Sequence, residues 1–274
     1  MTWCVCVVAR ADWAWRSEWG YKWVSVLHAA AINIGGRFDF EDYQGPGGSL
    51  CEQLFLDDTC HIYENIIEAN IRMGMDHMVW SPFGMGAFLR KLERNDTSFC
   101  DPLQKIRLRR NMAKKFVNAI GQIPETCSLK IELCLMTPHG RDKITEAWQN
   151  ADAFLRALIA APTETRNRVT LWENADSFHV SNLLAGRRKR VCLVNGANRK
   201  LLGNHWFGGG ALSAIDENLH RRSWTLATSS YMLNDFNGEN HKKGIRGRAE
   251  LESLVQSFGG DVHTFRCLER ELPF

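Results

Sequence analysis

Two adjacent carboxylates, Asp216 and Glu217, are the residues whose type and spacing most suggest catalysis. They lie six and seven positions after Gly210, the last residue of Gly208-Gly209-Gly210. Apolar packing around the two groups, or repulsion between them, raises the pKa of one carboxyl toward the range useful for a general acid. An acidic pair taken alone is more typical of a solvated surface. The glycines before it therefore decide how the pair is interpreted.

The triple glycine follows a polar strand end. An apolar run, Val191–Asn195, leads directly into Asn195-Gly-Ala-Asn198. Ligands bind at the carboxyl ends of the strands of a parallel sheet, where asparagine amides can bond ribose hydroxyls. The backbone N–H groups of Gly208, Gly209 and Gly210 can face phosphate oxygens, because glycine lets a ligand approach closely. A glycine turn without a ligand is an equally good reading of this segment by itself.

A second glycine loop follows the apolar run His77–Trp80. Its residues are Ser81, Pro82, Phe83, Gly84, Met85, Gly86, Ala87 and Phe88. The dinucleotide-binding fingerprint needs a third glycine and a later acidic residue, so Gly84-x-Gly86 does not match it. The loop is nevertheless a second candidate for binding phosphate. Two such loops, each after a strand, suit a diphosphate better than a single phosphate.

A third strand end carries small residues and an asparagine. The run Trp23–His28 is followed by three alanines, Ile32 and Asn33. Small side chains leave room beside a ligand, and Asn33 can bond to it. A strand that packs closely on a helix explains the alanines equally well.

Strands alternate with helices along the chain, which predicts an α/β fold with a mostly parallel sheet and helices on both faces. The predicted strands are apolar runs at 3–8, 23–28, 77–80, 128–135, 168–173 and 191–195, of a kind that is buried on both sides. The predicted helices lie at 62–73, 101–120, 144–160, 177–185 and within 211–231. We expect Asp101 to cap the second helix, with Pro102 in its first turn.

The sequence has no evident linker and predicts one domain over residues 1–274, with a lid or insertion at 37–60. That segment contains Gln44-Gly-Pro-Gly-Gly-Ser49 and is predicted to be irregular. The net charge is only +3, which gives nucleic-acid binding no support. Nine scattered cysteines, none in a CxxC pair, predict buried free thiols in a reducing cytoplasm. No apolar stretch reaches the length of a membrane span.

Two basic segments are predicted to be solvent-exposed. The run Arg187–Arg190 is typical of a solvated turn, although it can also meet an acidic partner. The basic residues from Lys105 to Lys115 are predicted to form the outer face of a helix.

These segments together resemble the macro domains, and most closely the bacterial-type poly(ADP-ribose) glycohydrolases. The family motif has an asparagine strand end, Gly-Gly-Gly, Gln-Glu-Glu and Leu-x-Arg-x-Ser, and this chain has Asn195 to Asn198, Gly208 to Gly210, Ile215-Asp216-Glu217 and Leu219 to Ser223. Ala30 to Asn33 resembles the family's Ala-Ala-Pro-Asn. Ser81 to Phe88 resembles its diphosphate loop, in which the phenylalanine packs near the nucleotide.

The resemblance implies binding of ADP-ribose and cleavage of its glycosidic bond, with Glu217 as the general acid and Asp216 beside it. It implies no metal or redox cofactor, and ADP-ribosylated protein or poly(ADP-ribose) as the partner. Two departures matter. Isoleucine and aspartate replace the first two residues of Gln-Glu-Glu, which leaves open a reader that binds ADP-ribose without cleaving it. The order of the motifs is inverted, which a circular permutation explains because domain termini often lie close together. A protein or nucleic-acid interaction module is the third alternative.

Overall fold

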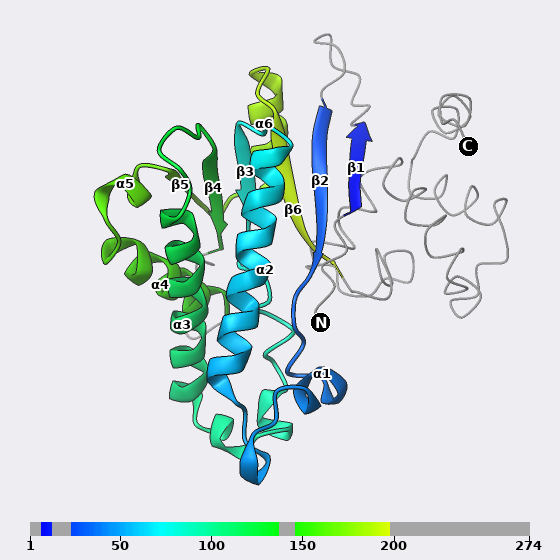
Figure 1. The fold of residues 1–274 in the computed structure, drawn as a ribbon, viewed down its shortest axis with the longest axis vertical. Coiled ribbons are helices and arrows are strands. Elements are labelled where there is room, and N and C mark those ends of the chain that lie inside the picture. The colour runs from blue at the N-terminus through cyan, green and yellow to red at the C-terminus, as the bar shows by residue number, and fades with distance from the viewer. Residues whose placement is uncertain (1–6, 13–22, 137–145, 198–274) are drawn as a thin grey trace, which may run out of the picture. The chain divides into compact units, whose positions relative to one another are not determined.

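The computed structural model describes residues 7–12, 23–136 and 146–197. Contacts group residues 31–194 of this part into one compact unit, and residues 7–12, 23–30 and 195–197 into a second. Figure 1 labels the helices and strands of both. The loops at 31–36 and 81–88, two of the three predicted ligand-binding segments, both belong to the first unit.

A parallel sheet forms the centre of the first unit. Its strands are β3 (His77–Trp80), β4 (Lys130–Leu135), β5 (Val169–Glu173) and the start of β6 (Val191–Ala197). They lie in the order β6-β3-β4-β5, and each neighbouring pair is parallel. Parallel neighbours need crossover connections, and helices provide them here. The predicted α/β class with a mostly parallel sheet is confirmed.

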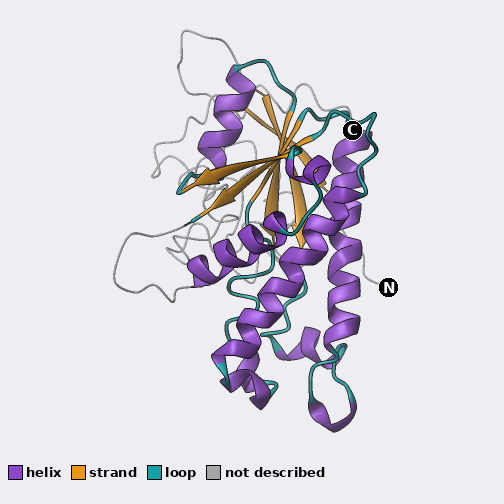
Figure 2. Ribbon diagram, turned by 90° about the vertical axis from the view of Figure 1, so that its left-hand side faces the viewer, coloured by secondary structure: helices purple, strands orange, loops and turns teal. Residues whose placement is uncertain are grey.

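Helices cover both faces of this sheet. The described helices of this unit are α1 (Arg37–Glu41), α2 (Glu52–Arg72), α3 (Pro102–Gly121), α4 (Glu146–Ile159), α5 (Thr163–Arg166) and α6 (Ser177–Gly186). Figure 2 shows α2 and α3 on one side of the strands and α6 on the other. The side chains of β4 are buried at every position from Ile131 to Leu135, although successive residues point to opposite faces. Both faces of the central strand are therefore covered.

Aromatic packing joins the sheet to the helices in front of it. Trp80 of β3 stacks on Phe116 of α3 with ring centroids 4.3 Å apart, and Tyr63 of α2 meets both rings edge-on. The start of α3 is set as predicted, since Asp101 accepts a hydrogen bond from the Leu103 N–H at 2.9 Å. Trp80 is the last residue of β3, so this packing fixes the point at which the chain enters the Ser81–Phe88 loop.

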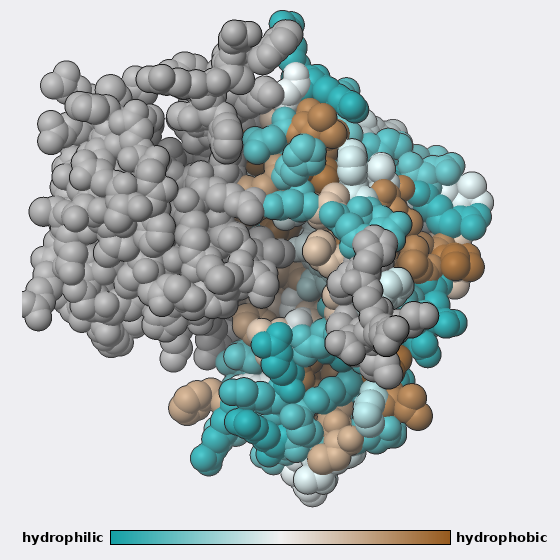
Figure 3. Space-filling view, turned by 180° about the vertical axis from the view of Figure 1, so that it is seen from behind, coloured by the Kyte–Doolittle hydropathy of each residue, from teal (hydrophilic) through white to brown (hydrophobic). Residues whose placement is uncertain are grey.

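The β5 strand differs from the predicted doubly buried strands. Thr170, Leu171 and Glu173 are exposed, because β5 is the last strand in the order of the described sheet. Leu155 and Ile159 of α4 are exposed as well. Figure 3 shows patches of hydrophobic surface on this side of the molecule.

The second unit contains an antiparallel pair of strands. They are β1 (Val7–Asp12) and β2 (Trp23–Ala30), in a register that pairs Val7 with His28 and Asp12 with Trp23. The predicted first strand, at 3–8, was wrong in its bounds, since the described strand runs to Asp12. The antiparallel pairing makes the chain a mixed rather than a purely parallel α/β protein.

The helix α2 begins earlier than the sequence predicts. Residues 52–59 were predicted to be irregular but form the first turns of α2, with Phe55, Leu56 and Thr59 buried. Cys134 is buried as expected, whereas Cys51 and Cys100 are exposed. A search of the described helices finds none with the length and apolar character needed to cross a membrane.

Candidate functional site

The Ser81–Phe88 loop is held from inside by its apolar side chains. Phe83 and Met85 are 6% and 0% exposed, so their side chains belong to the core and only their backbone is available to a ligand. Ser81, Gly86 and Phe88 are half-buried and Ala87 is exposed. The loop therefore presents a small-residue, backbone-rich outer side and an apolar inner side.

Gly84 lets this loop approach the segment that follows β2. Its φ is +74°, a left-handed conformation that glycine adopts without penalty. A Cβ at this position would lie 3.0 Å from the Cβ of Ala31. The alanine after β2, predicted to leave room for a ligand, thus leaves room for the neighbouring loop.

A backbone hydrogen bond joins the same two segments. The Gly35 N–H donates to the Phe88 carbonyl at 2.7 Å, and a Cβ on Gly35 would lie only 2.8 Å from that oxygen. Asn95 donates through its side-chain amide to the Ile34 carbonyl at 2.9 Å. The structure therefore brings together residues 31–36 and 81–88, which lie about 50 positions apart in the sequence.

Asn33 lies in this assembly and shapes its turn. The Asn33 side-chain oxygen accepts a hydrogen bond from the Gly36 N–H at 3.0 Å, as asparagine does in tight turns. The Asn33 backbone N–H donates to Asp39 at 2.9 Å. Asn33 is half-buried, so its role in the turn leaves part of the side chain accessible.

Several backbone donors of the loop have no acceptor within the described part of the chain. Among the described residues, no acceptor bonds the N–H groups of Gly86, Ala87 and Phe88, although the Gly86 and Ala87 carbonyls accept from Leu89 and Arg90. Successive backbone N–H groups without an internal acceptor can bind an anion when they point to the same side. A Cβ on Gly86 would meet no atom within 4 Å, so the space in front of this residue is open.

The space behind the loop is too small for a ligand. A cavity of about 10 Å³ lies between the loop and α2, lined by Gly84, Phe83, Thr59 and Tyr63 among others. A volume of this size holds one water molecule at most. Burial raises the pKa of the Tyr63 hydroxyl above its ordinary value, which keeps that group neutral. The cavity behind the loop cannot hold a nucleotide, so only the outer side of the loop is open to a ligand of that size.

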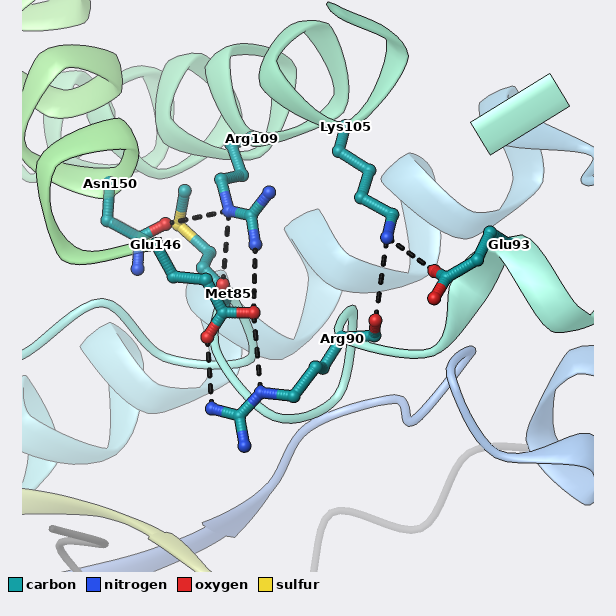
Figure 4. A network of polar contacts seen from close by, with 7 residues as sticks. All are labelled: Met85, Arg90, Glu93, Lys105, Arg109, Glu146 and Asn150. Atoms are coloured by element: carbon teal, nitrogen blue, oxygen red, sulfur yellow. Dashed lines mark hydrogen bonds and ion pairs between the residues drawn. The ribbon is translucent and has the colours of Figure 1, made fainter. Parts of the chain in front are cut away.

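A buried arginine, which the sequence reading missed, supports the loop from α3 (Figure 4). Arg109 is 1% exposed, and its Nε donates to the Met85 carbonyl at 3.3 Å and to the Asn150 side-chain oxygen at 3.1 Å. Its Nη2 lies 3.7 Å from Glu146, which also pairs with Arg90 at 3.0 Å. Burial lowers the pKa of Arg109 below its ordinary value, and Glu146 acts against that shift.

The prediction that the basic residues between Lys105 and Lys115 form an outer face was thus wrong for Arg109. Arg109 shares the buried face of α3 with Ala113, Phe116 and Ile120, at spacings of four, three and four residues. That spacing was the signal that would have identified it. Arg107 and Arg110, its neighbours on the helix, form ion pairs at the surface, as predicted for the whole segment.

Asn195 belongs to the second unit and is committed to an internal contact. It is fully buried, and its Nδ2 lies 2.9 Å from the Nδ1 of His28 in β2. A buried amide held in this way orients the end of β6 rather than presenting a free edge to a ligand.

The remaining predicted site residues lie outside the described part of the chain. They are Asn198, Gly208, Gly209, Gly210, Asp216 and Glu217. The basic run Arg187–Arg190 is described and forms an exposed turn before β6, in which Arg190 pairs with Asp76 at 3.1 Å.

Comparisons with protein-family models, with curated proteins and with solved structures give no match to this chain.

Proposed function

We propose that this chain binds ADP-ribose and hydrolyses the glycosidic bond that joins it to a protein or to a polymer. The observation that carries the proposal is the outer side of the Ser81–Phe88 loop, with its three unused N–H groups and open space at Gly86. Backbone N–H groups arranged in this way suit the oxygens of a diphosphate, which carries charge on both phosphates.

The segment after β2 supports the same proposal. Gly35 bonds to Phe88, so Asn33 is held within the assembly that contains the unused donors. An amide at this place can bond the polar groups of a nucleoside while the loop binds its phosphates. Phe88 is half-buried and offers an aromatic ring for packing against a base or sugar. Both segments also contain residues that resemble macro-domain motifs, and a circular permutation explains the order of these motifs in the chain.

Cleavage is assigned to Glu217, the residue that aligns with the family's catalytic acid. Its carboxyl group donates a proton to the leaving oxygen or nitrogen as the bond to C1″ of the ribose breaks. The resulting carboxylate then accepts a proton from the water that attacks C1″, which restores the acid and releases ADP-ribose. Asp216 raises the pKa of Glu217 or bonds a ribose hydroxyl, and Asn198 orients the same sugar.

Glu217→Gln tests both halves of the proposal. The amide has nearly the same shape but donates no proton as an acid, so we expect release of ADP-ribose from a modified protein to fall at least about 100-fold. Calorimetry should find the dissociation constant for ADP-ribose within about threefold of the wild-type value. Glu164→Gln makes the same change at an exposed position on α5 and serves as the control.

The outcomes separate the alternatives. A wild-type chain that binds ADP-ribose without turnover is a reader, which the Ile215-Asp216 departure from the family motif would explain. Equal turnover by Glu217→Gln and wild type would remove the assignment of the acid. Salt-sensitive binding of RNA without any affinity for ADP-ribose would replace the proposal by the interaction module.

A further inference from the structure

A buried guanidinium lies directly behind the loop to which we assign the diphosphate. Arg109 reaches from α3 to the Met85 carbonyl, and Asn150 and Glu146 of α4 hold it from the other side (Figure 4). Among the described residues, its nearest carboxylate is that of Glu146, which is 3.7 Å away and is shared with Arg90. Arg109 is thus a buried charge whose closest contacts are neutral oxygens.

Such a residue is not explained by stability alone. Removing a guanidinium from water is costly, and an apolar side chain of similar volume commonly gives an equally or more stable protein. An apolar side chain could not donate to the Met85 carbonyl, which is the contact that Arg109 makes with the loop. Met85 stands between Gly84 and Gly86, in a part of the loop without strand or helix hydrogen bonds.

The geometry of the peptide unit connects Arg109 to the outer side of the loop. The bond between Met85 and Gly86 is trans, so the carbonyl of Met85 and the N–H of Gly86 point in opposite directions. Arg109 holds the carbonyl toward the buried side. The Gly86 N–H, one of the three unused donors, is therefore directed away from Arg109, to the side on which a ligand can approach.

We infer that Arg109 is a positioning residue, which orients the Gly86 N–H toward a bound diphosphate by holding the Met85 carbonyl. This inference rests on the proposed function, because it assigns Arg109 to the same loop. Arg109 does not touch the ligand itself. The diphosphate is recognised by backbone donors, and the positive charge behind them strengthens the attraction at short range.

Arg109→Met and Arg109→Lys test the inference on the full-length chain. The probes are ADP-ribose, inorganic pyrophosphate and adenosine, each measured by calorimetry or ligand-observed NMR. Arg109→Met should weaken ADP-ribose and pyrophosphate binding about tenfold and leave adenosine unchanged. Arg109→Lys should recover part of the loss, because an ammonium group can donate to Met85. Arg110→Met removes an exposed arginine at the next position, paired with Asp152 at 2.9 Å, and should bind all three probes like wild type.

The adenosine probe separates positioning from general damage. A merely structural role would lower the binding-competent fraction for all three probes equally, and that result would overturn the inference. Unchanged pyrophosphate binding in Arg109→Met would overturn it while leaving the proposed function intact. A wild-type chain that binds none of the probes would overturn the proposed function, and the inference with it.

Asn150→Ala provides a second test if Arg109→Met does not fold. It keeps the guanidinium but removes the amide oxygen that holds it at 3.1 Å. We expect about threefold weaker pyrophosphate binding, again with adenosine unchanged. A variant that folds and binds pyrophosphate like wild type would overturn the inference.

Discussion

Two buried charged side chains of the first unit, Arg109 and Glu132, contact different kinds of partner. Glu132 lies in the middle of β4, is 3% exposed, and uses both oxygens, which contact the Nδ1 of His77 at 2.7 Å and the Nε1 of Trp172 at 2.6 Å. Arg109 makes longer contacts of 3.1 to 3.7 Å and reaches a loop carbonyl. One charge joins side chains of neighbouring strands, and the other holds a piece of backbone.

Glu132 and Arg109 differ in this way because the backbone of β4 already has its hydrogen bonds, whereas that of the Ser81–Phe88 loop has few. In β4 the ladders to β3 and β5 fix the main chain, so Glu132 adds only a cross-strand tie. His77 and Trp172 both lie diagonally from it in the register, within reach of long side chains. The Ser81–Phe88 loop has no ladder, and a side-chain donor must set the direction of its peptide units. The buried carboxylate of Glu132 thus links side chains of three neighbouring strands, whereas the buried guanidinium of Arg109 holds a loop carbonyl.

Glu132→Ala is expected to have the largest effect on stability. It leaves Trp172 and His77 without their shared acceptor and opens a cavity in the sheet, which together should lower the free energy of unfolding by about 3 kcal/mol. Urea unfolding measures the change. Ligand affinity per folded molecule should stay at the wild-type value, because Glu132 contacts no residue of the candidate loops.

Glu132→Gln keeps the volume and one acceptor, and should cost about half as much. Weaker pyrophosphate binding by folded Glu132→Ala would break the distinction between the two charges. It would show that the sheet and the loop respond as one network.

Gly84→Ala and Gly86→Ala distinguish the effect of the loop conformation on stability from the effect of open space on ligand binding. Alanine at position 84 must adopt a φ of +74° and approach Ala31 to 3.0 Å, which should cost about 1–2 kcal/mol of stability. Alanine at position 86 meets no atom within 4 Å, so stability should change by less than about 0.5 kcal/mol. Its methyl group nevertheless enters the space assigned to the diphosphate.

The two variants should therefore have opposite profiles. Gly86→Ala should weaken ADP-ribose binding about tenfold at unchanged stability, since a methyl group keeps phosphate oxygens away from the N–H groups. For Gly84→Ala the main change should be a loss of stability. Thermal unfolding and calorimetry on the same samples measure both quantities. Normal affinity in Gly86→Ala would place the ligand elsewhere.

Much of the first unit could be predicted from the sequence, because its strands and caps are local signals. The run His77–Trp80 is apolar and bounded by polar residues, and it forms β3 without a change of bounds. Asp101-Pro102 predicts the start of α3 for the same reason, since a cap is a contact between near neighbours. The glycines of the Ser81–Phe88 loop predicted a phosphate-binding loop, and the structure shows that Gly84 lets the loop approach Ala31.

The features that the sequence did not predict, the start of α2 and the burial of Arg109, depend on contacts between residues far apart in the chain. Gly45, Gly47 and Gly48 and the polar residues after them concealed the start of α2. Phe55, Thr59 and Ile62 nevertheless have helical spacing on a buried face. Arg109 was assigned to solvent because arginine is usually exposed. Its partner, the Met85 carbonyl, lies 24 positions away in the chain. Residue type alone does not reveal such a pair.

A partly exposed ion pair at the start of the sheet gives the smallest expected effect. Asp76 accepts hydrogen bonds from the Arg190 side chain at 3.1 Å and from the Arg190 N–H at 2.8 Å, and these hold the pKa of its carboxyl below the ordinary value. A lowered pKa means that the contribution to stability is present above the pKa of the unfolded chain. It is lost as the pH falls through the lowered pKa of the folded chain.

Asp76→Asn should accordingly lower the free energy of unfolding by less than about 1 kcal/mol at pH 7, because solvent screens the pair. The difference from wild type should shrink as the pH falls toward 3, where the wild-type carboxyl gains a proton as well. Urea unfolding at both pH values measures it. A difference that stays constant with pH would mean that it does not come from the charge of Asp76, and would contradict the ion pair as its source. The contrast with Glu132 is then one of burial: the same kind of carboxylate contributes several times more where no water competes for it.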